Sequence, residues 1–122
     1  MGSFEEFDHG GKHFVYIDLS GFKSNGEMSE FTRTASKAIA RYSENSIYTI
    51  TNVEDVRFET DLRKIVVDYL SANSPYVKCG AIIGIDGIKK VIISKLLKTS
   101  GRKNIFFSLS RKQAFEQLLK HD

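Results

Sequence analysis

The chain has 122 residues, of which 41% are hydrophobic and 27% are charged. This length suits one domain with a real core and is too short for two. No apolar run approaches the roughly 20 residues that a membrane-spanning helix needs, and the start lacks the order of a secretory signal. The one cysteine, Cys79, falls in a predicted buried strand, which fits a packed free thiol in a reducing compartment. We therefore expect a single cytoplasmic domain without a membrane span.

The charge is distributed unevenly along the chain. Residues 1–75 hold 8 Lys and Arg against 12 Asp and Glu, a net charge of −4, whereas residues 76–122 hold 10 against 3, a net charge of +7. Such asymmetry can mark a surface for acidic partners, lipid headgroups or nucleic acid. It also arises when solvated helix faces differ in composition, and we favour this second interpretation.

The first half of the chain predicts two strands separated by a helix. Residues 1–12 show no period, and we expect a flexible lead-in or a short edge element there. Aromatic and β-branched residues predict a strand over 14–19, and apolar residues at helical spacing follow from 28 to about 42. Alternation predicts a second strand over 46–53, whose threonines indicate that one of its faces is less apolar than the other.

The centre of the chain predicts a helix, a buried strand and a further helix. Thr60 stands just before the first helical pattern, where its hydroxyl can act as an N-cap, and Pro75 follows the end of that pattern. The most apolar run of the chain, residues 77–85, predicts a strand covered on both faces. The next helix is predicted from four apolar residues at intervals of three and four: Ile88, Val91, Ile92 and Leu96.

A short strand over residues 104–109 and a helix capped by Ser110 complete four successive β-α units. This order predicts a single α/β domain with a mostly parallel sheet of four to five strands. Ligands of such sheets usually bind beyond the carboxyl ends of the strands. In this chain that edge comprises residues 18–22, 52–58, 84–87 and 108–111.

No pattern in the sequence predicts an enzyme, a cofactor or a metal. The phosphate-loop patterns G-x-x-x-x-G-K-[ST] and G-x-G-x-x-G are absent, and no serine lies in a G-x-S-x-G elbow. His9 and His13 have the spacing of a helical metal site, but Gly10 and Gly11 between them argue against a helix. Aromatic residues of the basic half fall at core positions, which argues against nucleic acid as a partner. We therefore expect a non-catalytic binding protein.

Four segments resemble small bacterial SpoIIAA-like proteins of the STAS superfamily, whose domain is shared by sulfate transporters and anti-sigma-factor antagonists. The segments are HFVYIDLSGFKS, TITNVEDVRFETDL, NSPYVKCGAIIGIDGIKKVI and GRKNIFFSLSRKQAFEQLL. The resemblance covers about residues 13–120 and implies a STAS-like domain over residues 13–122, with a fold related to the CRAL-TRIO lipid-binding domain. Antagonists of this family carry a phosphorylatable serine at a helix start, and Glu59, Thr60 and Asp61 stand at the matching place.

Two functions follow from this resemblance and from the basic residues. The first is a regulatory module that binds a protein partner through the edge containing Thr60. The Thr60 hydroxyl is then either a phosphorylation site or simply a helix cap. The second is a binder of a lipid or small acidic amphiphile in a cleft between helices and sheet. The basic residues expected near its headgroup are Lys89, Lys90, Lys95, Arg102 and Lys103. The oligomeric state is left open.

Overall fold

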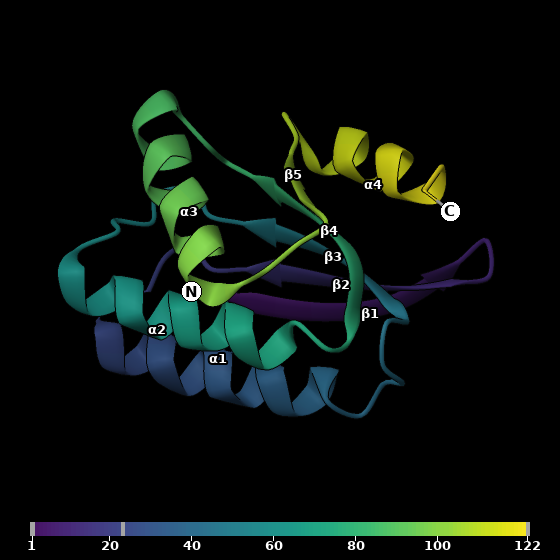
Figure 1. Cartoon of the computed structure of the whole chain (residues 1–122), viewed down its shortest axis with the longest axis horizontal. Coiled ribbons are helices and arrows are strands. Elements are labelled where there is room, and N and C mark those ends of the chain that lie inside the picture. Colours follow the sequence, from purple (N-terminus) through teal and green to yellow (C-terminus); the bar gives the residue numbers. More distant parts are fainter. Residues whose placement is uncertain (1, 23, 122) are drawn as a thin grey trace.

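A computed structural model describes residues 2–22 and 24–121 of the chain (Figure 1). Residues 1 and 122, the outer ends of the predicted lead-in and domain, therefore lie outside the described part. The elements, in chain order, are β1 (Ser3–His9), β2 (Lys12–Asp18), α1 (Asn25–Ile39), β3 (Ile47–Asn52), α2 (Thr60–Asn73), β4 (Val77–Ile83), α3 (Gly87–Ser100), β5 (Ile105–Phe107) and α4 (Arg111–Leu119).

The five strands form one sheet in the order β1-β2-β3-β4-β5, in which β1 is antiparallel to β2 and the other neighbours are parallel. The predicted α/β domain with a mostly parallel sheet is thereby confirmed. Of the two alternatives expected for the start of the chain, the structure shows the edge element, since residues 3–9 form the edge strand β1. Gly10 and Gly11 make this hairpin possible, because both have positive φ (60° and 79°), as a type I′ turn requires.

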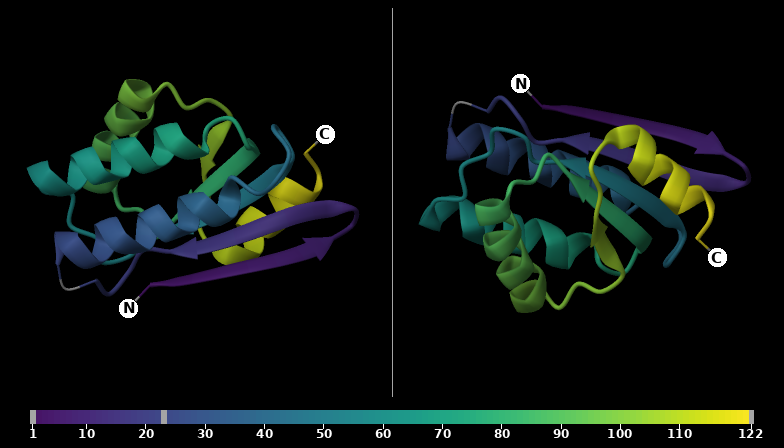
Figure 2. Two further views of the ribbon diagram at one scale, coloured as in Figure 1. Left: turned by 90° about the horizontal axis from the view of Figure 1, so that it is seen from below. Right: turned by 90° about the horizontal axis from the view of Figure 1, so that it is seen from above.

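Three helices cover one face of the sheet and a single helix covers the other (Figure 2). Alternate residues of β2 show the division: Val15 and Ile17 pack beneath α1, α2 and α3, whereas Phe14 and Tyr16 pack beneath α4. The first three helices share a face because each right-handed crossover steps to the next strand in the same direction. Cys79 is buried on the α4 side, as predicted for a packed thiol, and burial raises its pKa.

Two predicted helix features are wrong. Helix α1 spans Asn25–Ile39 rather than 28 to about 42, and it begins earlier because the Ser24 hydroxyl accepts a hydrogen bond from the backbone N–H of Glu27 at 3.2 Å. Helix α2 has Glu59 rather than Thr60 at its N-cap, and the Glu59 side chain makes no capping hydrogen bond. Thr60 is already the first helical residue, since the carbonyl oxygen of Glu59 accepts the first helical hydrogen bond from the Arg63 N–H at 3.0 Å.

Helix α3 presents a different face to the core from the one predicted. Ile88 and Val91 are 77% and 68% exposed, whereas Ile93 and Leu96 are buried. The face of α3 that turns toward the core therefore includes Lys89 rather than Ile88. The physical reason is position: α3 is the last helix of its layer and buries one side against α2 and the sheet, so its remaining apolar residues face solvent. Within the described residues, no helix combines the length and apolarity needed to cross a membrane.

Candidate functional site

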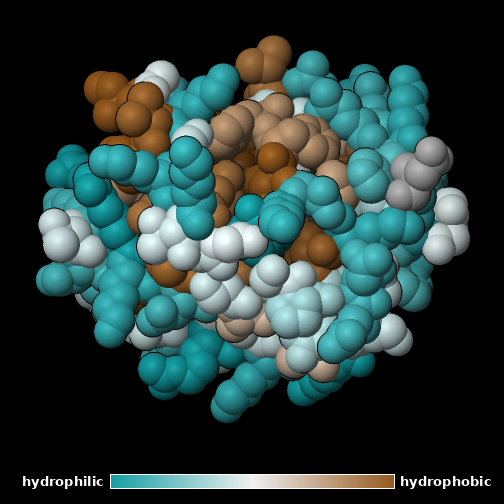
Figure 3. Space-filling model, in the orientation of Figure 1, coloured by the Kyte–Doolittle hydropathy of each residue, from teal (hydrophilic) through white to brown (hydrophobic). Residues whose placement is uncertain are grey.

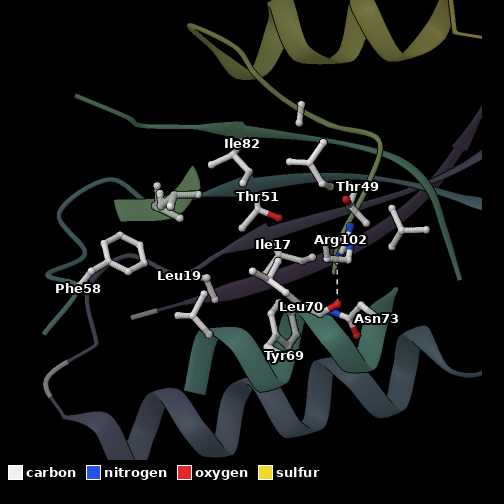
Figure 4. A pocket seen from close by; sticks show the side chains of 16 residues that line it. Ile17, Leu19, Thr49, Thr51, Phe58, Tyr69, Leu70, Asn73, Ile82 and Arg102 are labelled. Carbon is white, nitrogen blue, oxygen red and sulfur yellow. Dashed lines mark hydrogen bonds between the residues drawn. The ribbon is translucent and has the colours of Figure 1, made fainter. Parts of the chain in front are cut away.

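A cavity lies between the sheet and helices α2 and α3 (Figure 4). Its free volume is about 30 Å³, enough for one or two water molecules. Most of its wall is apolar and comes from four strands, two helices and the loop before α2. The apolar side chains are Ile17, Leu19, Val53, Phe58, Val66, Leu70, Val77, Ala81, Ile82, Ile93 and Ile105.

The polar groups of the cavity gather at one end. In Figure 4, Phe58 lies at one end, whereas Arg102 and Asn73 lie at the other with Tyr69 close to them. Tyr69 and Asn73 are only 6% and 3% exposed, and the Tyr69 hydroxyl and the Asn73 carbonyl oxygen have no hydrogen-bond partner among the described residues. Buried polar atoms are normally paired, so these two oxygens mark a place where a partner is missing.

Arg102 brings a positive charge to the same end. Its Nη1 donates a hydrogen bond to the carbonyl oxygen of Leu70 at 3.3 Å, which uses one of the five N–H donors of a guanidinium. Over residues 2–22 and 24–121, no carboxylate oxygen lies within 4.0 Å of its side-chain nitrogens. The guanidinium is half-buried, and burial lowers its pKa. An ion held in this way lacks the compensation that buried charges normally have.

Gly80 of β4 leaves room for this polar end. A Cβ atom built at Gly80 would lie 2.5 Å from the Thr49 hydroxyl oxygen and 2.8 Å from Cδ1 of Ile105, and 3.7 Å from Nη2 of Arg102. The missing side chain at Gly80 therefore leaves space in which the side chains of Thr49 and Arg102 both lie close to the β4 backbone. Thr49 is itself buried and adds a hydroxyl to the cavity wall.

Burial also acts on the Tyr69 hydroxyl. Loss of solvation is the main cause that raises the pKa of Tyr69 above 10.0, and the Asn73 amide and the Arg102 charge oppose the shift without cancelling it. The phenol therefore stays neutral and can donate its hydrogen to an anion held by Arg102. A neutral hydroxyl donor and a guanidinium at one end of an apolar cavity can together recognise a carboxylate, whereas the Asn73 carbonyl oxygen needs a donor such as water.

Only one of the five predicted basic residues lines this cavity. Arg102 does so, whereas the Lys89 ammonium donates to the carbonyl oxygen of Val53 at 3.0 Å and so ties α3 to the end of β3. Lys90 lies 5.6 Å from the centre of the Phe107 ring. Lys95 and Lys103 are exposed on the outer face of α3 and on the loop after it.

The predicted partner edge lies elsewhere. Glu59, Thr60 and Asp61 are exposed at the start of α2, and Glu59 lines a polar hollow together with Gly21, Asp55 and Arg57. No three His, Cys, Asp or Glu side chains in the described part of the chain gather closely enough to hold a metal ion. Phosphorylation of Thr60 and partner binding at this edge stay predictions.

Sequence reasoning missed Tyr69 and Asn73 because each had a simpler role. Tyr69 fitted the apolar face of α2, and Asn73 fitted the end of that helix. The threonines of β3 carried the available signal, since an otherwise buried strand face with two hydroxyls faces something polar.

The fold and cavity define a small α/β protein with an internal cavity. No protein-family model matches the chain, and no curated protein matches it. The STAS resemblance therefore stays a prediction, and the functional argument depends on the cavity.

Proposed function

We propose that this chain is a non-catalytic protein that binds a small acidic amphiphile, with the acid group on Arg102 and the apolar part along the cavity. One observation carries the proposal: a half-buried guanidinium without a carboxylate partner faces two unpaired buried oxygens in an apolar cavity. Arg102 is a positively charged donor, the Tyr69 hydroxyl is a neutral donor and the Asn73 oxygen is an acceptor. A carboxylate offers the negative charge and the acceptor atoms that Arg102 and the Tyr69 hydroxyl lack, and a water molecule can donate to the Asn73 oxygen.

Water alone is the simpler occupant, because the free volume admits one or two molecules. Water can bridge the Tyr69 hydroxyl and the Asn73 amide, but it does not neutralise the Arg102 charge. An anion accepts a hydrogen bond from the Tyr69 hydroxyl and also neutralises Arg102, and its attraction to the guanidinium is stronger in a poorly solvated site than at the surface. The unpaired charge therefore favours an anionic occupant over water.

The apolar wall favours a hydrocarbon tail on that anion. Ligand sites of this kind are mostly apolar with a few polar groups that fix orientation. A chain longer than a few atoms requires α3 to move outward. Two hydrogen bonds hold the ends of α3 in place. At its start the Lys89 ammonium donates to the Val53 carbonyl oxygen, and at its end the Ser71 hydroxyl donates a longer bond to the Ser100 carbonyl oxygen at 3.4 Å.

Calorimetric titration with octanoate, and with octan-1-ol as the uncharged control, tests the proposal. We expect wild type to bind octanoate more tightly than the alcohol. Replacing the guanidinium by an apolar side chain in Arg102→Met should weaken octanoate binding by about 10- to 100-fold, the value of a charge-assisted hydrogen bond. Arg102→Lys should retain part of the affinity, because it keeps the charge but not the planar fork.

Two outcomes would contradict the proposal. One is equal affinity of wild type for octanoate and octan-1-ol, which would reduce the site to a hydrophobic cavity. The other is unchanged octanoate binding in Arg102→Met, which would place the acid group elsewhere. Lys95→Met is the matched control, since it removes an exposed charge on the outside of the same helix. It should leave the titration unchanged.

A further inference from the structure

The most exposed large apolar side chains of the described residues lie on two neighbouring segments, the start of α3 and the turn after β5. Ile88 (77% exposed), Val91 (68%) and Leu109 (89%) are the large hydrophobic residues most exposed to solvent within residues 2–22 and 24–121. Two belong to the first turns of α3 and the third to the turn between β5 and α4. Singly exposed apolar residues are ordinary, but a group of them marks an interaction site.

Contacts within the fold bring these two segments next to each other. Ile88 and Val91 are three residues apart and so neighbours on the helix surface. Lys90, between them, extends its Nζ to 5.6 Å from the Phe107 ring of β5, and Leu109 follows that strand by two residues. Figure 3 shows hydrophobic surface over the first turn of α3 and again over the β5–α4 junction.

Positive charge borders this apolar group. Helix α3 contains four lysines and no acidic residue, and with Lys89 bound to Val53 the other three face solvent. A hollow on the outer face of α3 is lined by Val91 together with Lys90, Lys95 and Lys98, so apolar and basic groups share it. The carboxylate of Asp86, just before α3, caps the helix by accepting from the Lys89 N–H at 2.9 Å.

We infer that this α3–β5 surface, comprising Ile88, Val91, Leu109, Lys90, Lys95 and Lys98, docks onto an anionic lipid bilayer. The apolar side chains enter the boundary between headgroups and acyl chains, and the lysines contact lipid phosphates. A second copy of the chain fits less well, because an isologous contact would set lysines against lysines. The inference stands on this surface alone and does not require a ligand in the cavity.

Sedimentation with vesicles tests the inference on the full chain. We expect binding to vesicles of phosphatidylcholine with phosphatidylglycerol, little binding to phosphatidylcholine alone, and loss of binding at about 1 M salt, where the Debye length falls to about 3 Å. Changing Lys90, Lys95 and Lys98 to Gln should lower the partition coefficient by about fivefold per lysine. The matched control changes Lys37, Lys64 and Lys112 to Gln, three exposed lysines on the other helices, and should change it little.

The apolar contribution is tested by Val91→Ser with Leu109→Ser. Because both side chains are largely exposed, the variant should fold normally and bind the anionic vesicles at least tenfold more weakly. Equal loss in the two lysine variants would overturn the inference, since it would reflect net charge alone. So would absence of vesicle binding, or a dimer in sedimentation equilibrium that the Val91→Ser, Leu109→Ser variant dissociates. Arg102→Met should bind vesicles like wild type, so a failure of the cavity proposal is recognised separately.

Discussion

Tyr69 carries a hydroxyl that is buried without a hydrogen-bond partner in the described part of the protein. An unsatisfied buried polar group costs about 1–3 kcal/mol, whereas a phenylalanine of the same shape loses only the hydroxyl. We predict that Tyr69→Phe raises the free energy of unfolding of the ligand-free protein by about 1 kcal/mol. Urea unfolding measures it. A lower stability would instead show that ordered water already satisfies the hydroxyl.

The same residue gives an alkaline stability profile with a definite sign. The folded-state pKa of Tyr69 is raised above 10.0 by burial, so above about pH 10 the unfolded chain releases a proton that the folded protein keeps. The stability contributed by this group is therefore present below pH 10 and falls as pH rises further, by about 1.4 kcal/mol per pH unit. Comparing Tyr69→Phe with wild type across this range isolates the effect, which should be missing in the variant.

Helix α2 begins without a side-chain cap, which makes its first turn open to improvement. Glu59 has the extended backbone of an N-cap residue (φ −73°, ψ 163°) but its side chain accepts no backbone N–H. We predict that Glu59→Ser stabilises the protein by about 0.5–1 kcal/mol in thermal or urea unfolding. The opposite change at a helix that has a cap, Ser110→Ala, should cost about 1 kcal/mol, because the Ser110 hydroxyl accepts from the Gln113 N–H at 3.1 Å. An unchanged Glu59→Ser would mean that solvent satisfies the α2 terminus equally well.

Strand β4 depends on a glycine for packing rather than for backbone conformation. Gly80→Ala would place its Cβ 2.5 Å from the Thr49 hydroxyl oxygen, and overpacking of this kind typically costs about 1–3 kcal/mol. We predict that loss in urea unfolding, together with weaker octanoate binding as Thr49 and Arg102 are displaced. Gly87→Ala is the control, since no atom lies within 4 Å of a Cβ built there. If both variants had equal stability, β3 and β4 would have to accommodate the methyl group by shifting apart.

At the scale of elements, the sequence predicted most of the fold and little of the site. Periods of two and of three to four residues are local, and they were enough to order the strands and helices. The cavity is not local, because Arg102 meets the Leu70 carbonyl 32 positions earlier in the chain. The predicted inward face of α3 is also wrong, since Lys89 and Ile93 turn inward while Ile88 faces solvent. Which stripe is buried depends on the position of α3 at the end of its layer.

The molecule as a whole is covered unequally, and α4 alone shields one face of the sheet. Leu118 anchors it and is fully buried, with Phe14, Tyr48 and Ile83 in the same core cluster. We predict that Leu118→Ala costs about 2–5 kcal/mol in urea unfolding and exposes apolar sheet surface to the dye ANS. Leu109→Ala removes the same atoms from an 89% exposed side chain and should change stability by less than about 0.5 kcal/mol. Equal effects would indicate that α4 is detached in solution.

Each strand from β2 to β5 pairs with the strand before it in the chain. A growing polypeptide can therefore build the sheet in the order of synthesis, beginning with the β1–β2 hairpin. Each later strand joins an edge that already exists, and none has to be inserted between two finished neighbours. Only the hairpin is local, because the parallel pairs join residues 25 to 34 positions apart, and pairing over such separations is associated with slower folding. On the ribosome, the chain up to β4 would already hold most of its hydrogen-bonded ladder before the last helix emerges.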